Sequence, residues 1–160
     1  MDKPVVVILK KESYLAMIAN AVGTNLFRNV YARVDGEKKD ITKDGVRSCA
    51  LFVSSLLNHF HLIDSKRAPH TTIAGLEKNM KNSGWSTTEV PQPGDIIIWE
   101  PKLQADAENA HVGFFIGGDE AISNDWEMRV PIKHHMTYGK NDDGTPVRAI
   151  TAIYTYDFSS

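Results

Sequence analysis

The feature that most constrains the fold of this chain is a change in hydrophobic periodicity near its middle. Residues 12–22, 48–59 and 71–82 each carry apolar side chains at the spacing of an α-helix. Gly23 follows the first of these runs and Gly84 lies beyond the third, which is typical of helix ends. In the second half of the chain, apolar residues occur in short β-branched runs between turn residues, a pattern typical of strands. Helices followed by an antiparallel sheet predict an α+β fold with the N-terminal helices packed on the sheet.

The predicted strands are residues 95–99, the two arms of a hairpin within residues 111–124, residues 129–133 and residues 147–156. The hairpin is indicated by its Gly-Gly-Asp turn. Pro131 favours an edge position for the strand that contains it. At the N-terminus, the apolar run 5–9 predicts a short buried strand, whereas the polar residues 35–47 predict a loop.

Length and composition place the chain among ordinary globular proteins. Its 160 residues fit one domain spanning 1–160, and a hydrophobic content of 42% can build a core without disulfides or metal. A formal net charge of −2 shows no bias toward nucleic acid or an anionic membrane, so neither is predicted as a partner. No stretch reaches transmembrane length, and the run at 5–9 is too short for a signal peptide. A cytoplasmic protein is predicted, with a removed leader, secretion and delivery by a phage left open.

The single cysteine, Cys49, lies at the front of the second predicted helix. One cysteine cannot form an internal disulfide, and a lone buried cysteine most often serves as a small apolar core residue. On the first turn of a helix, however, a thiol is near the positive end of the helix dipole, which lowers its pKa and favours the nucleophilic thiolate. This position predicts a catalytic nucleophile if the chain also supplies a base.

Six histidines are candidates for that base, and the sequence context favours His111. His111 directly precedes the apolar stretch VGFF, so a strand would hold its ring rigidly where it can face a helix packed on the sheet. A third polar group should orient the imidazole, and Ser123, Asn124 and Asp125 lie at the end of the next strand. Ser123 and Asn124 would point to opposite faces of that strand, so only one can serve. Asn124 is favoured because its side-chain carbonyl can accept a hydrogen bond from the ring. The competing interpretation is a plain turn.

Three motifs in order resemble the NlpC/P60 family of papain-like cysteine peptidases. Residues 48–53 (SCALFV) resemble its nucleophile motif, residues 93–99 (PGDIIIW) its Pro-Gly-Asp-Leu strand, and residues 111–117 (HVGFFIG) its His-Val-Gly-Ile-Tyr-Ile-Gly segment. The resemblance spans roughly residues 48–124, about half of the chain. The related CHAP amidases share the order of cysteine and histidine and are a near neighbour.

The resemblance implies a papain-like α+β fold and thiol-dependent hydrolysis of an amide, in the family usually within the peptide part of bacterial peptidoglycan. Carried over by position, Cys49 is the nucleophile and His111 the general base. The third position falls on Ser123 when counted from His111, and on Asn124 if the turn holds one extra residue. A family tyrosine near the oxyanion and the substrate best matches Tyr31.

The chain departs from the family pattern around the nucleophile. Ser48 stands where the family usually has an aspartate, Ala50 and Leu51 replace a Ser-Gly pair, and the usual third histidine is missing. These departures bear on the substrate more than on the Cys-His chemistry. Together with Trp99, a tryptophan close to the motifs, Tyr31 and Ser48 are predicted to contact the substrate.

Three functions are compatible with the sequence. The first is a cysteine hydrolase that cleaves an amide or peptide bond in peptidoglycan-type peptides, and the second is a thiol acyltransferase on the same scaffold. The third is a non-catalytic binding module that retains the fold. No cofactor or metal is predicted, because free cysteine ligands are lacking and four histidines that could be offered as zinc ligands match no standard spacing: His59, His61, His134 and His135. The expected partner is a peptide or a peptidoglycan fragment, and nothing in the sequence indicates an oligomeric state.

Overall fold

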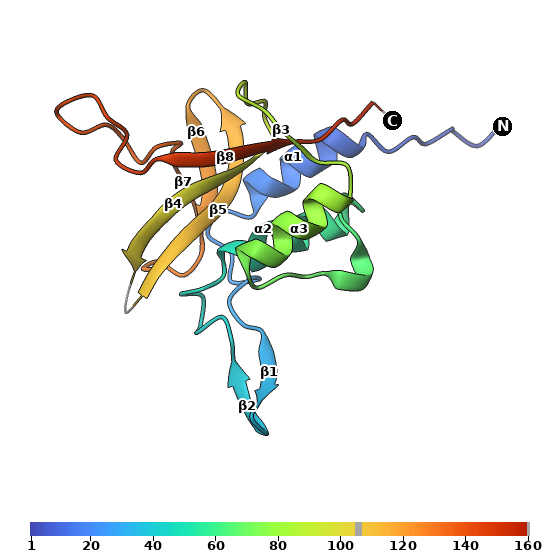
Figure 1. Ribbon diagram of the computed structural model, residues 1–160. Coiled ribbons are helices and arrows are strands. Elements are labelled where there is room, and N and C mark those ends of the chain that lie inside the picture. The colour runs from blue at the N-terminus through green and yellow to red at the C-terminus, as the bar shows by residue number, and fades with distance from the viewer. Residues whose placement is uncertain (105–106, 160) are drawn as a thin grey trace.

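The computed structural model describes residues 1–104 and 107–159. Its helices lie together on one side of an antiparallel sheet (Figure 1), so the predicted α+β fold is confirmed. The helices begin and end close to the predicted positions: α1 is Lys10–Asn20, α2 is Cys49–His59 and α3 is Ile73–Asn82, with a short 3-10 turn at Ser65–Arg67. A threonine caps α3, because the hydroxyl of Thr72 accepts a hydrogen bond from the backbone N–H of Gly75.

The main sheet has six strands in the order β3-β8-β4-β5-β6-β7, with antiparallel neighbours throughout. The strands are β3 Ser86–Thr87, β4 Ile96–Gln104, β5 Ala107–Gly117, β6 Glu120–Asn124, β7 Pro131–His135 and β8 Ile150–Thr155. The strand that begins with Pro131 is an edge strand, as predicted. β5 begins four residues earlier than expected, so His111 lies inside the strand rather than at its start.

Alternate residues of the central strands face two separate cores. The face covered by the helices carries Ile96, Ile98, Val112, Phe114 and Ile122. The helices are fastened there by the Phe52–Phe114 ring contact, with centroids 5.1 Å apart, and by the hydroxyl of Tyr14, which donates to the Gly94 carbonyl at 2.8 Å. The opposite face holds a smaller core of Ile97, Trp99, Phe115 and Ala121, with Met136, Tyr138 and Ile150 packed against it.

Residues 35–47 were predicted to form a loop, and part of this prediction is wrong. The segment contains β2 (Glu37–Asp40), which pairs with β1 (Tyr31–Val34) in a hairpin that projects away from the main sheet (Figure 1). Both of its strands are largely exposed and polar, so the hairpin has no apolar alternation by which it could be recognised. What stabilises it is a set of polar contacts at its base.

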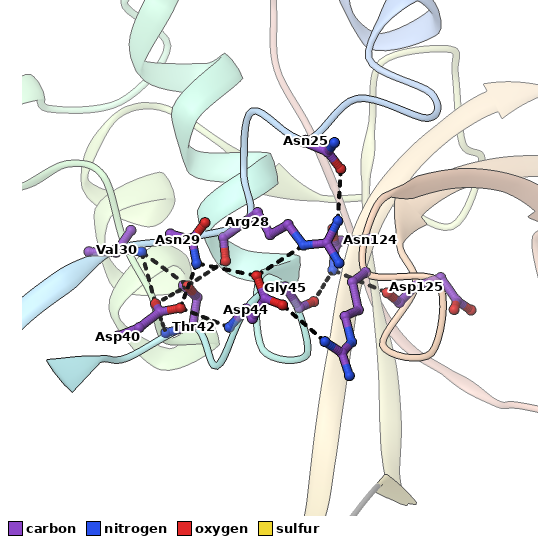
Figure 2. A network of polar contacts seen from close by, with 11 residues as sticks. Asn25, Arg28, Asn29, Val30, Asp40, Thr42, Asp44, Gly45, Asn124 and Asp125 are labelled. Carbon is purple, nitrogen blue, oxygen red and sulfur yellow. Dashed lines mark hydrogen bonds and ion pairs between the residues drawn. The ribbon is translucent and has the colours of Figure 1, made fainter.

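The carboxylate of Asp40 is the centre of those contacts (Figure 2). It accepts hydrogen bonds from the backbone N–H groups of Val30, Thr42 and Asp44 and from the side chains of Asn29 and Thr42. Desolvation raises the pKa of Asp40, but these hydrogen bonds outweigh it and hold that pKa well below its ordinary value. The loop between β2 and α2 is therefore fixed just before it reaches Cys49.

A second prediction, a buried strand at residues 5–9, is wrong. These residues form no strand, and their side chains are 60–91% exposed. A short apolar run becomes a strand only where a sheet edge pairs with it and a core covers it. The described sheets pair none of these residues, and the chain passes directly into α1 at Lys10.

Candidate active site

Cys49 is the first residue of α2, and its side chain lies against β5. The backbone N–H groups of Val112 and Ala50 lie close enough to the sulfur to favour its charged form. Val112 is paired with Ile98 of β4 and lies just before Gly113, where the pairing of β5 with β6 begins. The nucleophile predicted from the sequence is thus adjacent to the strand that carries His111.

The ionisation of this pair differs from the sequence-based expectation. Burial raises the pKa of Cys49, and the N–H groups of Val112 and Ala50 together with the charge of Arg148 offset only part of that effect. The predicted lowering of this pKa by the helix dipole is therefore wrong, because desolvation outweighs it. Burial also lowers the pKa of His111, and the nearby Arg148 and His134 lower it further, to about 3. At neutral pH both the thiol and the imidazole are uncharged.

His111 is oriented by a hydroxyl group. Its Nε2 atom lies 2.9 Å from Oγ of Ser123, and both side chains are buried. Ser123 is paired across the ladder with Gly113, where an added Cβ would lie 2.6 Å from the Cβ of Ser123. A glycine at this position therefore lets β6 approach closely enough for the contact with His111.

The structure separates Ser123 from Asn124, in agreement with the predicted strand parity. Ser123 contacts the His111 ring, whereas Asn124 donates from Nδ2 to the Gly45 carbonyl at 2.8 Å (Figure 2). The Oδ1 atom of Asn124 is buried and has no hydrogen-bond partner among the described residues. Asn124 thus holds the loop that leads into α2 and is not brought to the histidine ring that it was predicted to orient.

Two residues that the sequence did not single out complete the surroundings of His111. Nε2 of His134 lies 2.7 Å from Oγ of Ser123, and the Tyr138 hydroxyl lies 3.2 Å from the same oxygen. The rings of His134 and Tyr138 are stacked, with centroids 4.1 Å apart. His134 pairs with Ala121, two residues from Ser123, so its side chain is a diagonal neighbour of Ser123 on the same face. Only the β6–β7 register could have revealed this contact.

A buried cation, Arg148, also lies close to the pair and was missed. It is 5% exposed, and it donates from Nε to the Glu100 carbonyl at 3.0 Å and from Nη2 to the Asn109 carbonyl at 2.8 Å. Burial lowers the pKa of this guanidinium. In the sequence it is a single arginine near the start of the predicted strand 147–156, and no local pattern indicates that it is buried.

Two cavities meet at His111. The first, of about 330 Å³, is lined by Cys49 and His111 together with residues of α3 and its cap, of β5 and of the loop before α2. The second, of about 310 Å³, extends past His111 toward Tyr138 and Arg148. Both are bordered by Gln104, His111, Asn124 and Trp126. The nucleophile and the histidine therefore open onto a common cleft.

The three residues predicted to contact the substrate do not line this cleft. Tyr31 is 62% exposed on β1, where the ammonium group of Lys38 lies 4.7 Å from its ring centroid. Ser48 is fully buried, and its hydroxyl has no partner within the described part of the chain. Trp99 is also fully buried, donates from Nε1 to the Met136 carbonyl at 2.7 Å and packs beside His111. Substrate contact by any of the three stays a prediction.

Residues 1–104 and 107–159 contain no group of three or more histidine, cysteine, aspartate or glutamate side chains arranged to hold a metal ion. Within the same residues, every helix is too short or too polar to cross a membrane.

Comparison with known proteins places the fold. No family model matches the chain, and no curated protein matches it in sequence. Among solved structures, NlpC2 from Trichomonas vaginalis is similar, with a TM-score of 0.52, 17% sequence identity and coverage of 94% of this chain. The chain spans about half the length of that protein, 50%. At this identity the likeness establishes a shared fold, so the predicted NlpC/P60-type fold is confirmed, whereas the resemblance to CHAP amidases stays a prediction.

Proposed function

We propose that this protein is a cysteine hydrolase that cleaves an amide or peptide bond, with peptidoglycan-type peptides as its substrate class. The observation that carries the proposal is the placement of Cys49 and His111 on one cavity, the former at a helix N-terminus and the latter oriented by Ser123. Nucleophile, base and orienting group are the parts that thiol-dependent acyl transfer requires. The NlpC/P60-type fold and the three sequence motifs support the assignment of substrate class.

In this mechanism the attack and the proton transfer occur together, because both groups are neutral at rest. Nδ1 of His111 takes the proton of the Cys49 thiol as the sulfur forms a bond to the carbonyl carbon of the substrate. The carbonyl π electrons move to oxygen, which becomes the oxyanion. When the oxyanion collapses, the C–N bond breaks, and His111 returns the proton to the leaving amine. Water then attacks the thioester with His111 as base, which releases a carboxylic acid and the free thiol.

The start of α2 can stabilise the oxyanion. The side chain of Ser48, at the N-cap position, accepts no hydrogen bond from the first turn of the helix. The backbone N–H groups of Cys49 and Ala50 lie near the sulfur and favour its charged form. An oxyanion that forms next to that sulfur would meet these donors and the positive end of the helix dipole.

The proposal is tested by incubating the full chain with stem peptides from peptidoglycan and following the release of new amino groups. We expect Cys49→Ala and His111→Ala to abolish release, and His59→Ala, at the exposed end of the same helix, to leave it unchanged. Rapid acid quenching and mass spectrometry should detect an acyl group on Cys49 in the native chain. The loss on His111→Ala is expected to be 10²-fold or more, the usual scale of a general base.

The alternatives give different outcomes in the same experiment. If an added amine or alcohol captures the acyl group faster than water does, the protein is an acyltransferase. If the stem peptides bind without forming an acyl adduct on Cys49, the hydrolase proposal is overturned and a binding module takes its place.

A further inference from the structure

The hydrogen-bond network behind His111 has a direction that the chemistry of its atoms determines. It begins at the backbone carbonyl of His135, which lies 2.8 Å from Nδ1 of His134. A carbonyl can only accept a hydrogen bond, so Nδ1 of His134 must carry the hydrogen. A neutral imidazole has one N–H group, and Nε2 of His134 is therefore an acceptor.

Ser123 continues the network toward the active site. Its hydroxyl donates to the acceptor Nε2 of His134 at 2.7 Å, and this uses its one hydrogen. Its two lone pairs can then accept from Nε2 of His111 at 2.9 Å and from the Tyr138 hydroxyl at 3.2 Å. Burial raises the pKa of Tyr138 to about 12, so that hydroxyl keeps its proton and can donate. The donor and acceptor capacity of Ser123 is fully used in this arrangement.

We propose that His134 is a positioning residue that acts through Ser123 to hold His111 in the tautomer with its hydrogen on Nε2. Nδ1 of His111 is then left with a lone pair and is the atom able to accept the Cys49 proton. This inference rests on the proposed function only in that last step. The direction of the network is a property of the resting protein and can be measured without a substrate.

The network works in this direction only while His134 is neutral. Burial lowers the pKa of His134. The hydrogen bond to the His135 carbonyl and the charge of Asp125 oppose this effect, whereas the charges of His135 and Arg148 add to it. The groups that face the ring are His111, Ser123, Tyr138 and Trp99. A protonated His134 would donate to Ser123, which would then turn its own hydrogen to His111 Nε2 or to the Tyr138 oxygen. In the first case the proton of His111 moves to Nδ1, and the base is lost.

The direct test is the ¹⁵N NMR spectrum of the histidine side chains in the native chain at neutral pH. We expect His111 to carry its hydrogen on Nε2 and His134 to carry it on Nδ1. If His111 in the native chain carries its hydrogen on Nδ1, the inference is overturned, whether or not the protein cleaves stem peptides. The expected tautomers without any cleavage of stem peptides would instead count against the proposed function alone.

Substitution of His134 separates a hydrogen-bonding role from a packing role. His134→Gln keeps an acceptor oxygen that does not titrate, whereas His134→Phe keeps a ring that can stack on Tyr138 but has no acceptor. We expect the rate of Cys49 alkylation by iodoacetamide at pH 7 to fall about fivefold or more in His134→Phe, the scale of one lost neutral hydrogen bond. In His134→Gln we expect a rate near that of the native chain and a weaker fall as the pH is lowered. His59→Phe, an exposed histidine on α2, serves as the control.

A structural role for the His134 ring would give the reverse order, with the Phe variant close to the native chain and the Gln variant impaired. That order, or equal rates in both variants, would overturn the inference. If either variant fails to fold, the tautomers of the native chain still decide the question.

Discussion

At the scale of single residues, the hydroxyl of Ser123 reaches His111 because the residue across the ladder has no side chain. A Cβ on Gly113 would meet the Cβ of Ser123 at 2.6 Å and the Ile122 carbonyl oxygen at 2.7 Å. A Cβ atom and a backbone carbonyl of β6 cannot move out of such an overlap unless the strand itself moves. The glycine of the His-Val-Gly motif therefore has a positional role in the site as well as a role in the sheet.

We expect Gly113→Ala to lower both stability and thiol reactivity. The free energy of unfolding should fall by about 1–3 kcal/mol, the usual cost of overpacking, and displacement of Ser123 should reduce the rate of Cys49 alkylation. Urea unfolding and the alkylation assay measure the two effects. Gly118→Ala is the control for the alkylation rate alone: its added Cβ meets no atom within 4 Å, but its φ of +60° makes any side chain there costly for stability. Equal alkylation rates in the two variants would contradict the positional role.

Sequence analysis identified the site residues that lie in a recognisable local motif. It missed the residues that reach the site only through the pairing of strands or the assembly of the sheet. Cys49 is marked by its place before an apolar helix, and His111 by the strand motif that follows it. His134 contacts the site diagonally across a strand pair, and Arg148 becomes buried only when the sheet is assembled. Neither position has a local pattern from which burial near Cys49 could be predicted.

At the scale of elements, the hairpin β1-β2 and the loop before α2 depend on polar contacts, some part-buried and some exposed. Thr42 is fully buried. Its one hydroxyl hydrogen is shared between the Asp40 carboxylate at 2.7 Å and the Arg28 carbonyl at 2.8 Å, and its oxygen accepts from the Val30 N–H at 3.0 Å. Asp44 in the same loop is bound by the guanidinium groups of Arg28 and Arg129. These contacts fix the path of the chain that leads to Cys49. We therefore expect their loss to alter the position and reactivity of Cys49.

We expect Thr42→Val, which preserves the shape of the side chain, to lower the free energy of unfolding by about 1–3 kcal/mol, because Asp40 and the Arg28 carbonyl lose the donor that they share. Cys49 alkylation should also slow as the loop loses its anchor. Thr87→Val, at an exposed position on β3, should change stability by less than about 0.5 kcal/mol. A Thr42→Val protein as stable and as reactive as the native chain would show that the polar contacts do not hold the loop.

The difference between elements held by apolar burial and elements held by polar contacts explains which of them could be predicted from the sequence. The helices and the strands of the main sheet follow apolar periodicity, because each has a face that must be buried. The hairpin β1-β2 is exposed on both faces and is held by Asp40 and its donors, so hydrophobic patterning does not indicate it. The apolar run at residues 5–9 has the composition of a strand but no edge that pairs with it.

At the scale of the whole molecule, the uncharged pair of Cys49 and His111 limits the range of pH in which the fold is most stable. The pKa of His111 falls to about 3 on folding, and burial lowers the pKa of His134 as well, from an ordinary value of about 6.5. Below about pH 6.5 the unfolded chain therefore binds more protons than the folded one, and stability falls with pH. Cys49 acts in the opposite direction, since its raised pKa makes stability fall as the pH rises above about 8.5.

We expect urea unfolding to give maximal stability between about pH 6.5 and 8.5. Between pH 6.5 and 4.5, His111→Gln should have a shallower acid slope than the native chain, by up to about 1.4 kcal/mol per pH unit for the one proton removed. Cys49→Ala should flatten only the alkaline side, and His59→Gln, exposed at the end of α2, should leave both sides unchanged. An identical acid slope in native and His111→Gln proteins would mean that His111 is not kept neutral by folding. Attack by a neutral thiol–imidazole pair would then have to be replaced by attack from a preformed ion pair.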